Sequence, residues 1–322
     1  MLLEVEDLAV TFRDDREVRA VDGVSFAVDA REVVGLVGES GCGKSVTSLA
    51  LIGLLANQNT RRVRVEGRAS FDGLDLLRAD ARTLRDIRGR EIAMIFQDPL
   101  SSLNPVVPIG VQVAEVLIRH RGASKPEAMR RAAELLERVG IPDPTRRLKE
   151  YAHQLSGGMQ QRALIAMAVA CRPRLLIADE PTTALDVTIQ AQILELLKEL
   201  VREDGTAMIM ITHDLGVVAG LCDSVNVLYA GRVVESAGRH SLFGRPVHPY
   251  TVGLLRSIPR LDEDRGARLT PIRGSVRDVL PWAQGCAFAP RCDRAIEECL
   301  AGPPPLAGVA HTYRCVNPEA LP

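Results

Sequence analysis

An eight-residue segment, Gly-Glu-Ser-Gly-Cys-Gly-Lys-Ser at residues 38–45, constrains the fold more than any other part of the sequence. It follows an aliphatic run at residues 33–37 that indicates a buried strand, and a stretch with helical spacing begins near Gly43. Glycines let backbone N–H groups approach phosphate oxygens, and the N-terminus of the following helix favours their negative charge. The strand–loop–helix context therefore predicts the phosphate loop (residues 38–45) of a P-loop NTPase.

Each part of the phosphate loop has an expected role. The Lys44 ammonium should reach the β- and γ-phosphates, and the Ser45 hydroxyl should ligate Mg²⁺. The rest of the expected ATP contacts are Gly38, Ser40, Gly41, Cys42 and Gly43.

Two consecutive carboxylates, Asp179 and Glu180, follow the apolar run at residues 175–178. Ligands of open α/β sheets bind at this carboxyl end of the strands. We expect Asp179 to hold Mg²⁺ and Glu180 to orient and deprotonate the attacking water. A solvated acidic strand end before a turn at Pro181 is the alternative, and the phosphate loop makes it the weaker one.

Apolar runs alternate with helical patterns along the first 238 residues, which predicts an α/β fold with a largely parallel sheet. Residues 98–172 show helical spacing with almost no strand pattern, as an inserted helical subdomain would. Proline, glycine and cysteine become frequent after residue 238, which indicates a loop-rich extension. The expected strands are residues 2–10, 33–37, 91–96, 175–178, 207–211 and 225–229.

The charge and aromatic content of the chain limit the classes of partner that it can bind. The net charge is -1 and aromatic residues make up 3% of the chain, so nucleic acid is not expected as a partner. The first residues lack the basic start and apolar stretch of a secretory signal, and no apolar run is long enough to span a bilayer. We expect a cytosolic chain whose membrane role is peripheral.

The segment Leu-Ser-Gly-Gly-Met-Gln-Gln-Arg at residues 155–162 resembles the signature of ABC (ATP-binding cassette) ATPases. Ser156 and the N–H groups of Gly157 and Gly158 can start a helix whose positive end faces a γ-phosphate. The resemblance implies a head-to-tail dimer in which Ser156, Gly157, Gly158 and Asp186 contact ATP bound to the other subunit. It also implies the ABC-cassette type of P-loop NTPase fold.

Other positions match the same family in order. Gln97 resembles the glutamine that contacts Mg²⁺ and the attacking water, and His213 resembles the histidine that contacts the γ-phosphate. Ala184-Leu185-Asp186 resembles the family's D-loop. Phe12 lies where family members place an aromatic side chain against adenine. Cys42 departs from the usual serine, at a position where the backbone matters more than the side chain.

The resemblance is more specific at residues 38–41, 96–105, 248–251 and 285–292, which are similar to ATPases of oligopeptide and dipeptide importers. It implies a nucleotide-binding domain at residues 1–238, an importer-type extension at 239–322, and ATP hydrolysis that drives peptide import at the cytoplasmic face of the membrane. Implied partners are a second, homologous but different ATPase subunit, two permease subunits and an extracytoplasmic solute-binding protein. Importers of nickel, glutathione or other solutes share much of the pattern. A soluble ABC ATPase acting on nucleic acid or ribosomes is a more distant alternative.

Four of the seven cysteines, Cys286, Cys292, Cys299 and Cys315, fall within 30 residues of the proline-rich extension. A reducing cytosol disfavours disulfides, and the spacing matches neither common zinc sites nor ferredoxins. We expect these thiolates to ligate a four-iron four-sulfur cluster that cross-links a segment with little apolar core. Zinc, with His311 as a substitute ligand, and a metal-free tail are alternatives, and a redox carrier is a rival function.

Overall fold

The computed structural model describes residues 1–13, 17–55, 62–183, 185–257, 272–276 and 284–319, and the chain divides into two compact units. The first unit comprises residues 1–28, 33–78 and 210–322, and the second comprises residues 29–32 and 79–209. The division passes through strand β8 (Ala207–Thr212), so each unit is described by itself.

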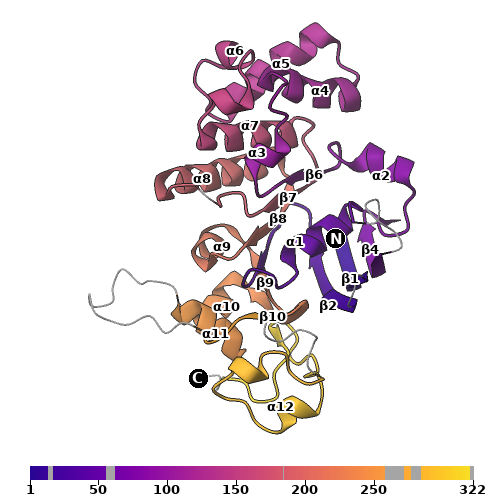
Figure 1. The fold of residues 1–322 in the computed structure, drawn as a ribbon, viewed down its shortest axis with the longest axis vertical. Helices are drawn as coiled ribbons and strands as arrows, with labels where there is room; N and C mark the ends of the chain where they lie inside the picture. The colour runs from indigo at the N-terminus through magenta and orange to yellow at the C-terminus, as the bar shows by residue number, and fades with distance from the viewer. Residues whose placement is uncertain (14–16, 56–61, 184, 258–271, 277–283, 320–322) are drawn as a thin grey trace. The chain divides into compact units, whose positions relative to one another are not determined.

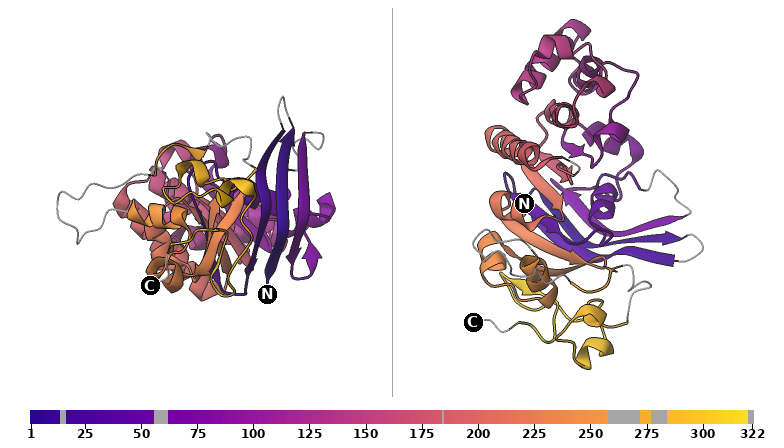
Figure 2. Two further views of the ribbon diagram at one scale, coloured as in Figure 1. Left: turned by 90° about the horizontal axis from the view of Figure 1, so that it is seen from below. Right: turned by 60° about the vertical axis from the view of Figure 1, so that its left-hand side comes forward.

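The first unit opens with a four-stranded antiparallel sheet in the order β2-β1-β4-β5, whose long strands lie side by side in Figure 2. The burial of β2 alternates toward its C-terminal end, because one face of the strand is packed and the other is open. Its strands are β1 (Leu3–Arg13), β2 (Glu17–Val28), β4 (Val63–Phe71) and β5 (Leu74–Asp75).

A second run of strands in the same unit follows the order β11-β10-β9-β3. β3 (Val33–Val37) is buried along its whole length and pairs in parallel with β9 (Ser224–Tyr229). β10 (Arg232–Gly238) pairs antiparallel with β9 and with the short β11 (Thr312–Tyr313), which joins the C-terminal region to this sheet. In Figure 1 the C-terminal region, orange to yellow, lies next to β10.

Short helices complete the first unit. None exceeds eight residues in its described part. They are α1 (Lys44–Leu51), α9 (Leu215–Leu221), α10 (Arg239–Gly244), α11 (Pro249–Arg256), η3 (Ala289–Arg291) and α12 (Glu298–Ala301).

The second unit contains the parallel pair β6 (Ile92–Ile95) and β7 (Leu175–Asp179) and a group of helices between them in sequence. α4, α5 and α7 pack against one another in this group (Figure 1). The helices between the two strands are α3 (Pro99–Ser102), α4 (Ile109–Arg121), α5 (Lys125–Arg138), α6 (Pro144–Arg147), η1 (Ala152–Gln154) and α7 (Gly157–Val169). Two further helices of this unit are α2 (Ala81–Ile87), which precedes β6, and α8 (Val187–Asp204), which follows β7.

The expected α/β class is confirmed, and every expected strand lies on an observed one. The expectation of a largely parallel sheet is incomplete, because β2, β4 and β10 carry antiparallel pairings that the sequence reading did not include. These strands contain polar residues and glycine, so they lack the continuous apolar run that identifies a fully buried strand. No helix among the described residues has the length and apolar character needed to cross a bilayer.

Candidate functional site

The phosphate loop connects β3 to α1 in the first unit, as predicted. Gly38 has φ +151°, and a Cβ there would lie 2.2 Å from the Leu228 carbonyl oxygen, so only glycine fits this turn. Gly43 occupies the position before α1 in a left-handed conformation, and the helix begins at Lys44. Cys42 is fully buried, which raises the pKa of its thiol and keeps it neutral.

Lys44 is buried although it carries a charge. Its Nζ donates hydrogen bonds to the carbonyl oxygens of Gly38, at 2.7 Å, and of Glu39, at 2.9 Å. Buried ammonium groups need such partners, because an unpaired charge would be costly in the interior. The ammonium is therefore held inside the loop where the phosphates of a nucleotide would be bound.

Glu39, the second residue of the loop, is held by two residues from the C-terminal region. Its backbone N–H donates to the Tyr250 hydroxyl at 2.8 Å. Its carboxylate accepts two hydrogen bonds from the Arg291 guanidinium, at 2.6 and 2.9 Å. Neither residue is predicted from the sequence to contribute to the loop, because their segments, 248–251 and 285–292, carry only the family resemblance. Their separation of 211 and 252 residues from Glu39 left no local pattern to reveal the contact.

Two further predicted residues lie in the first unit. His213 is exposed and follows the last residue of β8, directly before Asp214 caps α9 by accepting from the Gly216 N–H at 2.7 Å. Phe12 is half-buried on β1, where it lies opposite Val18 and Val63. The nucleotide roles of both residues stay predictions.

In the second unit, β7 ends at Asp179, which is buried, and Glu180 follows with φ +46°. A left-handed backbone is strained for a residue with a side chain, and such strain concentrates at functional sites. The Glu180 carboxylate accepts from the Thr183 hydroxyl at 2.8 Å and from the Gln97 amide at 3.1 Å. The structure thus joins two predicted catalytic residues, and Thr183 is a partner that the sequence analysis missed.

The signature segment (residues 155–162) forms the start of α7 as predicted. Ser156 is the N-cap and accepts from the Met159 N–H at 3.4 Å, while Gly157 is the first helical residue. Gly158 is needed for close packing, because a Cβ there would lie 2.9 Å from a methyl carbon of Ile189 on α8. Asp186 caps α8 by accepting from the Ile189 N–H at 3.0 Å. Ala184 lies outside the described residues.

The four clustered cysteines line one small pocket together with His248 and Phe288. Cys286 donates its backbone N–H to the Cys299 carbonyl at 2.7 Å, which brings two of the segments together. Burial raises the pKa of the thiols of Cys286 and Cys292, and of Cys315 to about 11. Yet the described residues include no group of three or more His, Cys, Asp or Glu side chains placed as metal ligands. His311 instead contacts the buried Glu235, 2.7 Å away.

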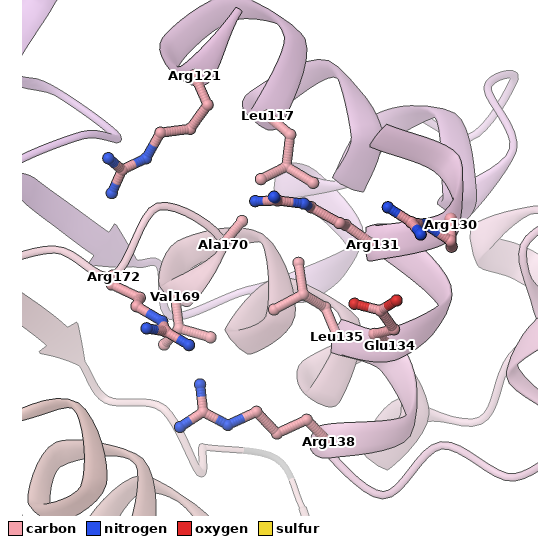
Figure 3. A pocket seen from close by; sticks show the side chains of 10 residues that line it. All are labelled: Leu117, Arg121, Arg130, Arg131, Glu134, Leu135, Arg138, Val169, Ala170 and Arg172. Atoms are coloured by element: carbon pink, nitrogen blue, oxygen red, sulfur yellow. The ribbon is translucent and has the colours of Figure 1, made fainter. Parts of the chain in front are cut away.

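A separate pocket of about 660 Å³ lies among α4, α5 and the end of α7 (Figure 3), and no predicted site residue lines it. Arg138 pairs with Glu203 and Asp204, and Arg131 pairs with Glu127. These carboxylates offset part of the positive charge of the lining. Its lining arginines are Arg121, Arg130, Arg131, Arg138 and Arg172.

Comparison with known proteins agrees with this geometry. The family model of the ABC transporter matches residues 21–183, which carry the phosphate loop, the signature segment and the carboxylate pair. A second model, the C-terminal region of oligopeptide/dipeptide transporters, matches residues 234–299.

Individual relatives extend over nearly the whole chain. The oligopeptide transport ATP-binding protein OppD of Salmonella typhimurium is 52% identical over 305 residues, which cover 94% of this chain and 90% of that protein. A putative peptide import ATP-binding protein of Brucella abortus is 51% identical over 98% of this chain and 97% of its own length. A solved dimeric ATP-binding cassette in a post-hydrolysis state with ADP and Pi is 32% identical and has a TM-score of 0.65, over 74% of this chain and 98% of that one. The chain therefore belongs to the ATP-binding subunits of ABC transporters and carries the C-terminal region of the oligopeptide/dipeptide group.

Proposed function

We propose that this chain binds and hydrolyses ATP to drive the import of peptides across the cytoplasmic membrane. The observation that carries the proposal is the combination, in one chain, of the ATP-hydrolysing motif set with the C-terminal region of oligopeptide/dipeptide transporters. Relatives that are 51–52% identical in sequence over nearly the whole chain are named as ATP-binding proteins of peptide transport or import.

Within the proposed reaction, Lys44 and the loop backbone bind the phosphates of ATP, and Phe12 packs against adenine. Ser45, Asp179 and Gln97 would hold Mg²⁺, which would supply the positive charge that offsets the charge of the phosphates. Glu180 accepts the proton of the attacking water, which Gln97 helps to orient, and His213 contacts the γ-phosphate. The Glu180–Gln97 hydrogen bond supports this division of roles, because it keeps the carboxylate oriented as a proton acceptor.

The partners are proposed from the family. Ser156, Gly157, Gly158 and Asp186 would contact the nucleotide of a second, homologous ATPase subunit, and two permease subunits and an extracytoplasmic solute-binding protein would complete the importer. Support comes from the solved dimeric cassette to which this chain is similar, and from the exposed N-terminus of α7. The chain would act at the cytoplasmic face of the membrane, attached through the permeases.

Transport by the reconstituted importer tests the proposal. The wild-type complex in vesicles should take up a labelled oligopeptide only with ATP, and Lys44→Ala should abolish both uptake and ATP hydrolysis. A control variant, Lys198→Ala at an exposed position of α8, should transport normally. ATP-dependent uptake of nickel or glutathione without peptide uptake would identify the alternative solute class. Co-purification with RNA or ribosomes and without a permease would favour the soluble ATPase instead.

We also propose that Cys286, Cys292, Cys299 and Cys315 hold a four-iron four-sulfur cluster with a structural role. Their shared pocket supports a common metal centre, since four thiols suit either iron–sulfur or zinc chemistry. The pocket volume of about 10 Å³ leaves room for little more than a single atom. A four-iron four-sulfur cluster would therefore require the cysteine-bearing segments to move apart.

Metal analysis after anaerobic purification separates these two centres. If the cluster is present, we expect about four iron atoms and four acid-labile sulfide ions per chain, and a brown protein. Cys299→Ser should lose the metal, and Cys171→Ser, a buried cysteine of the second unit, should keep it. A colourless protein with one zinc would establish the alternative centre.

A further inference from the structure

We infer that Arg291, in the C-terminal region, is a positioning residue of the phosphate loop that sets the affinity of the loop for ATP through Glu39. The inference rests on the proposed role of the phosphate loop in nucleotide binding. Arg291 would act in two ways, because it fixes the start of the loop and neutralises the carboxylate that the loop itself carries.

The Arg291 guanidinium is fully engaged. Its side chain is 4% exposed, and each of its five N–H donors has an acceptor. Two of them bind the Glu39 carboxylate in a bidentate pair, which is the strongest geometry available to an arginine. The other acceptors are the carbonyls of Arg273 and Gly274 and the Tyr229 hydroxyl.

The connection from Arg291 to Lys44 consists of consecutive hydrogen bonds. Arg291 binds the carboxylate of Glu39, and the Tyr250 hydroxyl accepts a hydrogen bond from the Glu39 backbone N–H. The Glu39 and Gly38 carbonyls in turn accept from Lys44 Nζ. Each backbone and carboxylate group of Glu39 is thereby fixed, so the carbonyls that hold Lys44 have little freedom to move.

The charge of Arg291 in the Glu39–Arg291 ion pair should also affect the affinity of the loop for ATP. Glu39 is part of the loop that receives the phosphates, and an unpaired carboxylate there would repel them. The aromatic rings of Tyr229 and Phe288 lie 5.7 and 6.0 Å from the guanidinium carbon and exclude water from one side of the pair. The Glu39 side chain is 31% exposed, so loss of Arg291 would leave a partly screened negative charge at the ATP site.

The test is ATP affinity of the full chain, measured by titration calorimetry. Arg291→Ala should weaken ATP binding at least about tenfold. The control is Arg294→Ala, because Arg294 is a half-buried arginine of the same region that contacts Asn317, Pro318 and Glu319 and not the phosphate loop. Arg294→Ala should bind ATP within about twofold of the wild type.

Rescue separates this role from a merely structural one. Adding Glu39→Gln to Arg291→Ala removes the uncompensated charge and should recover most of the lost ATP affinity. A purely structural role would not predict this recovery, because the second substitution does not restore the contacts of Arg291. ATP binding by Arg291→Ala within about twofold of the wild type, or a loss that Glu39→Gln does not relieve, would overturn the inference. If Arg291→Ala does not fold, Arg291→Lys decides: weakened binding supports the role, and unchanged binding overturns it. Lys44→Ala tests the proposed function separately, because unchanged ATP binding in that variant would show that the loop is not the nucleotide site.

Discussion

Lys44 in the phosphate loop and Glu180 after β7 are held in different ways. Lys44 is 4% exposed, and backbone carbonyls fix its ammonium within a loop that buried residues from the distant C-terminal region support. Glu180 is half-buried, has a strained backbone, and is held by the side chains of Gln97 and Thr183. A binding group that must always present the same charge is thus fixed by main chain, whereas a proton acceptor is held by side chains that can exchange partners. The comparison predicts that substitutions around Glu180 affect turnover and that substitutions around Glu39 affect binding or stability.

The largest effect is expected from Glu180→Gln. The glutamine keeps the size and hydrogen-bonding capacity of the side chain but cannot accept the proton of the attacking water, so kcat for ATP hydrolysis should fall roughly 100- to 10,000-fold. ATP affinity should change little, because Lys44 is untouched. Single-turnover hydrolysis and calorimetric ATP binding measure the two quantities, and near-normal turnover would place the proton acceptor elsewhere.

A second variant, Ser156→Arg, places a long charged side chain at the N-terminus of α7. We expect turnover of the assembled importer to fall about a hundredfold, as when one preorganised donor is lost from a catalytic site. ATP binding to the isolated chain should be preserved, because the proposed contact is made with the other subunit's nucleotide. Equal loss of affinity at the chain's own phosphate loop would contradict a shared site.

Thr183→Val tests the side-chain support of Glu180 with nearly unchanged volume. Loss of one hydrogen bond to the carboxylate should lower kcat about three- to tenfold and leave the KM for ATP within twofold. Thr182→Val, the same change one residue earlier, is the matched control and should have a smaller effect. A change in KM alone would mean that Thr183 serves ATP binding, and that side chains around Glu180 do not act on turnover alone.

The smallest effect is expected from Tyr250→Phe, which removes the acceptor of the Glu39 N–H and keeps the packed ring. The free energy of unfolding should fall by about 1 kcal/mol, with a slightly higher KM for ATP and unchanged kcat. Tyr313→Phe on β11 provides the control for loss of a tyrosine hydroxyl in the same region. A large fall in kcat would show that the support of Glu39 also serves catalysis.

The sequence predicted the parts of this molecule whose chemistry is local. The turn at residues 38–45, the cap at Ser156 and the strand before Asp179 each depend on neighbouring residues, so short patterns identified them. Strand β2, which pairs antiparallel with β1, was not predicted, because its mixed polar and apolar residues fit a half-exposed strand and a loop almost equally well. The Glu39–Arg291 ion pair was not predicted for another reason, because its two segments meet only after the chain has folded.

The distance along the chain between Glu39 and Arg291 has a consequence for synthesis. Glu39 leaves the ribosome 252 residues before its partner, which at about 5–20 residues per second corresponds to roughly 13–50 seconds. During that time the nascent chain carries a phosphate loop without its counter-charge. A truncated product ending before Arg291 would have the same defect, so translation must reach the C-terminal region before the newly made subunit acquires its full affinity for ATP.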